Sequence, residues 1–93
     1  MEISNLVWDE ENEERVQSNG LDPEEVDQAV HDPSGVEGVP KGKRGRTRLV
    51  RLGRASSGRY VLAVLEVFGG GSARPITARL MREYEKRQYE AGR

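Results

Sequence analysis

Residues 46–68 read Arg-Thr-Arg-Leu-Val-Arg-Leu-Gly-Arg-Ala-Ser-Ser-Gly-Arg-Tyr-Val-Leu-Ala-Val-Leu-Glu-Val-Phe, and this stretch decides the fold. Its first half places arginines among aliphatic residues, a Ser-Ser-Gly break follows, and its second half is a nearly continuous aliphatic run. The pattern predicts two antiparallel strands joined by a short turn. Because the second strand carries most of the apolar residues, we expect it to be the core strand, buried on both faces.

Two acidic segments precede this hairpin and carry helix-start signals. Asp9 is suited to cap a helix over residues 10–16, whose first turn is rich in glutamate. Asp22, followed by Pro23 and then by Glu25 at the third helical position, predicts a second helix. A His-Asp-Pro sequence ends that helix.

The flanking segments complete the predicted fold. Residues 3–8 are apolar enough for a short strand or a tether, and residues 73–77 predict a third strand, in which Pro75 marks an edge or a bend. Residues 78–90 predict a C-terminal helix that packs Leu80, Met81 and Tyr84 on the sheet. We therefore expect one α+β domain over residues 1–93, with two N-terminal helices, an antiparallel sheet of three or four strands and a C-terminal helix.

Composition excludes several kinds of site. The chain has no cysteine and one histidine, which excludes disulfides, thiolate zinc sites and histidine clusters. No apolar run approaches the length of a membrane span, and no secretory signal pattern is present, so we expect a cytoplasmic protein that does not contact membranes.

Residues 34–45 are rich in Gly and Lys and predict a flexible loop. This segment lacks the phosphate-loop pattern, which excludes nucleotide hydrolysis of that kind.

The charges divide along the chain. Residues 1–39 hold twelve acidic residues and one arginine, whereas residues 40–93 hold fourteen basic residues and four glutamates, so the net charge is -1. A basic half of this kind predicts a nucleic-acid face, and the loop residues Lys43 and Arg44 are suited to grip phosphates non-specifically. The alternative is that the acidic helices pair internally with the basic sheet and that no partner is involved.

Several residues occur in an order that carries a family resemblance. They are Trp8-Asp9, Asn12, Gly20, Glu25, Asp32-Pro33, Gly53, Gly58-Arg59, Arg74, Ala78-Arg79 and the spacing from Glu85 to Tyr89. In this ordered set the chain resembles the BrnT family of toxins from bacterial type II toxin–antitoxin modules. It departs from that family at Ser18-Asn19, where Lys-His is usual.

The resemblance implies a compact RelE-like fold and a ribonuclease that works without a metal or another cofactor. It also implies a ribbon-helix-helix antitoxin that binds and silences the toxin, and it allows for a homo-oligomer within that complex.

Cleavage of RNA by its own 2′-hydroxyl requires proton transfer and stabilisation of the negative charge that builds around phosphorus. Matching to the family positions makes Arg59 and Arg79 candidate catalytic residues, and Glu25 is placed to orient an arginine or accept a proton. The candidate nucleic-acid contacts are Arg74, Arg54, Arg46, Arg48, Lys43 and Arg44. Tyr84 and Tyr89 are suited to stack on bases or to pack the final helix.

Two other functions fit the same residues. A nucleic-acid-binding module without catalysis would use the arginines for affinity and release no product. A protein-interaction module would present the acidic helices to a basic partner and hold the hairpin arginines in internal salt bridges.

Overall fold

The computed structural model describes residues 3–38 and 48–92, so Lys43, Arg44 and Arg46 of the predicted basic loop lie outside the described residues. Within them the protein is a small α+β structure with three α-helices and a five-stranded sheet. The elements are β1 (Asn5–Leu6), α1 (Glu10–Ser18), α2 (Pro23–Val30), β2 (Val36–Gly38), β3 (Arg48–Arg54), β4 (Tyr60–Val67), a 3-10 turn (Gly69–Gly71), β5 (Ser72–Leu80) and α3 (Glu83–Ala91). Over the described residues, no helix is both long enough and apolar enough to cross a membrane.

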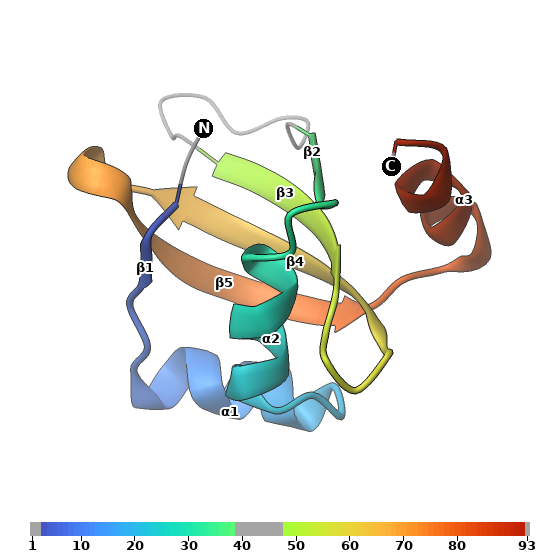
Figure 1. Cartoon of the computed structure of the whole chain (residues 1–93). Coiled ribbons are helices and arrows are strands. Elements are labelled where there is room, and N and C mark those ends of the chain that lie inside the picture. The colour runs from blue at the N-terminus through green and yellow to red at the C-terminus, as the bar shows by residue number, and fades with distance from the viewer. Residues whose placement is uncertain (1–2, 39–47, 93) are drawn as a thin grey trace.

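The sheet has the strand order β1-β5-β4-β3-β2 (Figure 1). The predicted hairpin is confirmed, because β3 pairs antiparallel with β4, the central strand. β1 lies within residues 3–8, where a short strand or a tether was expected. Two features differ from the prediction: β2 is a strand within residues 34–45, which were expected to form a loop, and β1 runs parallel to β5, so the five-stranded sheet is mixed. β2 has only three residues, which is too short to show an alternating pattern in the sequence.

α1 and α2 lie together on one face of the sheet, whereas α3 stands apart from them beyond the end of β5 (Figure 1). Both predicted helix starts are confirmed, because Asp9 and Asp22 each form a reciprocal capping box with the third helical residue. The core strand is buried on both faces: Val61 and Leu65 pack under α1 and α2, while Leu62 packs on the side of α3.

β5 extends further than the sequence predicts, and the C-terminal helix begins later. Residues 78–80 continue β5, because pairing with β4 provides them with ladder hydrogen bonds that local helix preference cannot replace. Of the three side chains expected on the sheet, only Met81 is buried; Leu80 is 44% exposed and Tyr84 is 51% exposed. Tyr89 anchors α3 instead, in one cluster with Met81, Leu52 and Leu62.

Pro75 lies where the ladder between β4 and β5 shifts register, which confirms the predicted bend. β1 pairs only with Ser72 and Ala73, so the rest of this edge of β5 has no neighbouring strand among the described residues. Side chains of α1 and of Asn19, its C-cap residue, take its place: Asn12, Arg15 and Asn19 donate hydrogen bonds to the carbonyl oxygens of Pro75, Ile76 and Ala78, respectively. The edge is thereby protected against pairing with another chain.

Gly53 allows α2 to approach β3 closely. A Cβ at this position would lie 1.9 Å from the carbonyl oxygen of Ala29. We therefore expect Gly53→Ala to lower the free energy of unfolding by about 3 kcal/mol, measured by urea denaturation. Gly38→Ala is the matched control, because a Cβ there meets no atom within 4 Å. Equal stability of the two variants would contradict the close packing of α2 on β3.

Candidate nucleic-acid interface

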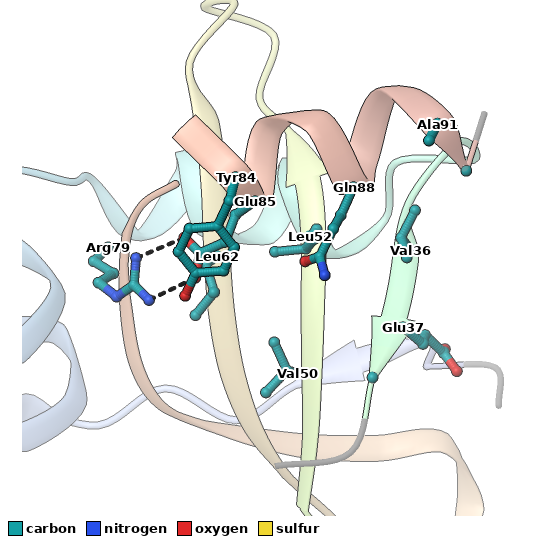
Figure 2. A pocket seen from close by; sticks show the side chains of 12 residues that line it. Val36, Glu37, Val50, Leu52, Leu62, Arg79, Tyr84, Glu85, Gln88 and Ala91 are labelled. Atoms are coloured by element: carbon teal, nitrogen blue, oxygen red, sulfur yellow. Dashed lines mark hydrogen bonds and ion pairs between the residues drawn. The ribbon is translucent and has the colours of Figure 1, made fainter. Parts of the chain in front are cut away.

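α3 covers part of the sheet face that lies opposite α1 and α2, and an open groove of about 890 Å³ remains between α3 and the strands (Figure 2). We call it the α3 groove. Its apolar floor is formed by Val50, Leu52 and Leu62, while Arg79, Tyr84, Glu85 and Gln88 line it from β5 and α3. An apolar floor with a few polar groups is typical of a ligand-binding groove.

Arg79 is held at one end of the groove by Glu85 (Figure 2). Its two terminal nitrogens donate to the two carboxylate oxygens of Glu85, each at 2.8 Å, and Nη1 also donates to the carbonyl oxygen of Leu80. The Glu85 side chain is 6% exposed, whereas that of Arg79 is 34% exposed. The guanidinium is therefore fixed in orientation by the fork geometry while part of it faces solvent.

The Arg79–Glu85 ion pair shifts the pKa values of both side chains. The Arg79 guanidinium, assisted by the backbone N–H of Arg82 at 2.7 Å, lowers the pKa of Glu85 to about 2. Glu85 in turn raises the pKa of Arg79. At neutral pH Glu85 is consequently an ionised anchor for Arg79 and is unsuited to carry protons.

Tyr84 lies beside the Arg79–Glu85 pair with its phenol at the mouth of the groove (Figure 2). Half of its side chain is exposed, so packing does not occupy the ring. A phenol can stack on a base and can donate or accept a proton. Arg79 and Tyr84 together thus provide a fixed cation and a proton-bearing group within one groove.

Arg59 and Glu25 form a different cluster, on the side of α2. Arg59 Nη1 lies 3.1 Å from Oε1 of Glu25, and the hydroxyl of Ser57 donates to Oε2 at 2.8 Å. Oε1 also accepts the backbone N–H of Asp22 in the capping box, and this bond is the main reason that the pKa of Glu25 is lowered. Glu25 therefore caps α2 and ties the hairpin turn to it.

The structure does not bring Arg59 and Arg79 together. Arg59 reaches α2, which covers one face of the sheet, whereas Arg79 reaches Glu85 of α3 on the other side. Arg59 directly precedes β4, and Arg79 of β5 is the partner of Leu62, so both arginines lie at the same end of β4. Because successive positions of a strand point to opposite faces, Arg59 lies on the face that α2 covers and Arg79 on the face of α3. One phosphate cannot be bound by both side chains in this arrangement.

The other predicted contacts are dispersed. Arg74 Nε donates to Asp9 at 2.9 Å and its Nη2 to Glu11 at 3.2 Å, which ties β5 to the start of α1. Hydrogen bonding to Asp9 is the main reason that the pKa of Arg74 is raised. Arg48 begins β3 opposite Glu66, and its Nε is buried without a hydrogen-bond partner among the described residues.

Arg54 ends β3 with its guanidinium over the ring of Tyr60, 5.0 Å from the ring centre. Lys86 of α3 approaches the same ring at 5.5 Å. Sequence reasoning named Arg54 but missed Glu85 as the partner of Arg79, and it missed Lys86 altogether. A Glu six residues after an arginine carries no signal of its own, because the contact depends on the turn between β5 and α3.

Ser18 and Asn19, where the chain departs from the BrnT pattern, end α1. The Asn19 side chain donates to the carbonyl oxygen of Ala78 at 2.8 Å, and the Ser18 hydroxyl donates to that of Arg15 at 2.9 Å. Both side chains satisfy backbone groups in this chain.

Comparison with protein-family models and with curated proteins found no match to this chain.

Proposed function

We propose that the protein is a BrnT-like toxin with a RelE-like fold, a ribonuclease that cleaves RNA in the α3 groove without a metal and that a ribbon-helix-helix antitoxin silences. The observation that supports this function most directly is Arg79, a cation fixed by Glu85 and partly exposed in an open groove beside Tyr84. A fixed cation is what stabilises a phosphorane when no metal ion takes part.

The residues of the groove have distinct parts in this reaction. The ribose 2′-oxygen attacks phosphorus after its proton passes to water, the bond from phosphorus to the 5′-oxygen breaks, and Arg79 donates hydrogen bonds to the phosphate oxygens as their charge increases. Tyr84 donates the proton that the departing 5′-oxygen takes up, and the phenolate then regains a proton from water. Glu85 remains ionised throughout and keeps the guanidinium in place. The products carry a 2′,3′-cyclic phosphate and a 5′-hydroxyl.

The floor of the groove favours single-stranded RNA as the substrate. Half-buried Val50, together with the small exposed parts of the buried Leu52 and Leu62, forms an apolar floor against which an unpaired base can pack, and Gln88 of α3 offers an amide to the edge of that base. Bases in a duplex are stacked and paired and cannot enter such a groove. The exposed ring of Tyr84 adds a stacking surface at its mouth.

Toxin activity is tested by induced expression in bacteria. We expect the wild-type chain to arrest growth and the Arg79→Ala variant, produced at the same level, to be tolerated. Normal growth with soluble wild-type protein would contradict the toxin assignment.

The antitoxin is expected to cover the α3 groove with acidic side chains, since this is the surface that RNA must reach. We therefore expect Arg79→Glu to weaken binding of the cognate antitoxin at least tenfold in titration calorimetry, because it places a like charge in the interface. Arg15→Glu makes the same charge change on α1, on the other layer of the molecule, and should leave the affinity unchanged. Equal affinities of the two variants would place the antitoxin elsewhere.

A second function, a protein-interaction module, is favoured by one observation. Arg59, Arg74 and Arg79 each have a carboxylate within 4.0 Å, so much of the predicted basic face is neutralised internally. Such pairs hold the sheet and helices together and leave less positive charge for RNA. A folded protein that neither binds nor cleaves RNA, but binds a basic protein partner through its acidic helices, would support this function.

A further inference from the structure

Arg54 and Lys86 bring two positive charges to one aromatic ring. The guanidinium carbon of Arg54 lies 5.0 Å from the centre of the Tyr60 ring, and Nζ of Lys86 lies 5.5 Å from it. Tyr60 is itself held by hydrogen bonding of its hydroxyl to Glu90 at 2.9 Å and by edge-on contact with Tyr89, whose ring centre is 5.7 Å away. The fixed ring therefore keeps both cations at one end of the sheet.

These two charges are less compensated than those of the paired arginines. The carboxylate contact of Lys86 is to Glu83, at 4.0 Å between two exposed side chains, and a contact of this kind contributes little. Arg54 forms no ion pair with any residue in the described part of the chain, and its Nε donates to the neutral carbonyl of Gly58. Both cations thus remain available to an anion.

Carboxylates are also present at this end of the sheet. Glu83 and Glu90 line the hollow next to Tyr60, together with Lys86 and Arg87. Asp32 also lies at this end, where it accepts the backbone N–H of Arg54 and the hydroxyl of Tyr89. Three basic side chains, Arg54, Lys86 and Arg87, thus stand among three carboxylates, and none of these carboxylates forms an ion pair with the Arg54 guanidinium in the described part of the chain.

The cluster lies next to Arg79. Tyr60 and Leu62 are on the same side of β4, two residues apart, and Leu62 is the Cα partner of Arg79. Two residues of a strand span roughly 7 Å. The α3 groove and the hollow beside Tyr60 are lined by different faces of α3. A single strand of RNA with one phosphate at Arg79 therefore has to pass the start of α3 to bring a neighbouring phosphate to the Tyr60 ring.

We propose that Arg54 and Lys86, held around Tyr60, form a second phosphate-binding position for single-stranded RNA, adjacent to the phosphate at Arg79. The identity of the ligand rests on the proposed function. The role of the two residues concerns affinity and does not require cleavage.

The test uses a fluorescent single-stranded RNA with 2′-O-methyl groups, which can bind but cannot be cleaved through the 2′-oxygen. Its association constant is measured over a range of salt concentrations for the full-length protein and for Arg54→Gln, Lys86→Gln, the double variant and Lys86→Arg. Arg15→Gln, which removes one charge from α1, is the control. Circular dichroism confirms that each variant is folded.

We expect each glutamine variant to lower the slope of log K against log salt by about 0.7, and the double variant by about 1.4, because each loses one phosphate contact. Lys86→Arg and Arg15→Gln should retain the wild-type slope.

Slopes that do not change in the double variant, or that fall equally in Arg15→Gln, would overturn the second phosphate position even if the protein cleaves RNA. Normal slope changes with no cleavage of unmodified RNA would leave this position intact and refute the nuclease instead. The same slope changes with a polyglutamate peptide, and none with RNA, would assign the cluster to an acidic protein.

Discussion

Arg79→Ala should lower the rate of RNA cleavage by about a hundredfold or more, because it removes the fixed donor that stabilises charge on the phosphorane. Arg79→Lys should recover only a small part of that loss. Lysine restores the charge, but it cannot form the two-pronged contact with Glu85 that orients the guanidinium. Single-turnover rates on a short single-stranded RNA provide the measurement.

Arg59→Ala is the informative comparison, because Arg59 also pairs with a glutamate but lies on the side of α2. We expect it to reduce stability and to leave the rate per folded molecule within a few-fold of the wild type. Urea denaturation of each variant separates a loss of folded protein from a loss of chemistry. Equal losses of rate in Arg59→Ala and Arg79→Ala would show that the α3 groove alone is not the reaction site.

Acid should destabilise the protein as Glu85 becomes protonated. The pKa of Glu85 is about 2 in the folded protein, below its ordinary value of 4.5. As the pH falls, the unfolded chain therefore binds this proton at a higher pH than the folded protein does. The resulting stabilisation is fully present above about pH 4.5 and is lost as the pH falls towards 2. The shift corresponds to about 3 kcal/mol, and partial exposure of Arg79 reduces this to about 2 kcal/mol.

Glu85→Gln tests this assignment, since it removes the titrating group and keeps the shape of the side chain. The variant should be less stable by about 2 kcal/mol at pH 7, because Arg79 loses its ion pair and one of the two oxygens that accept from its guanidinium. It should also lose less stability than the wild type between pH 4.5 and 2.5. Parallel pH profiles of urea denaturation for the two proteins would contradict the Arg79–Glu85 coupling.

Local signals predicted the elements that local chemistry determines. The capping residues Asp9 and Asp22 identified both N-terminal helices, and the Arg-rich and aliphatic runs around Ser56 identified the hairpin. The start of α3 was misplaced because residues 78–80 pair with β4, a contact that no local pattern encodes. A short strand over residues 3–8 was anticipated as one of two possibilities, but its parallel pairing with Ser72 and Ala73 depends on the folded sheet and could not be predicted.

Individual site residues could be predicted from the sequence, but their positions relative to one another could not. Family resemblance directed attention to Arg59 and Arg79, but their positions on opposite faces depend on strand register, which is a property of the folded sheet. The division of charge along the chain likewise did not determine which acidic side chains lie next to which basic side chains in the folded protein. In the fold, Asp9, Glu11 and Glu25 pair with Arg74 and Arg59, so part of the acidic half neutralises the basic half, as the internal-pairing alternative required.

Cleavage of unmodified single-stranded RNA by the purified, folded protein in the presence of a metal chelator tests the central claim most directly. The predicted result is time-dependent cleavage into fragments with 2′,3′-cyclic phosphate and 5′-hydroxyl ends, at a rate that Arg79→Ala lowers by about a hundredfold or more. RNA that remains intact under these conditions, with wild-type protein shown by circular dichroism to be folded, would contradict it.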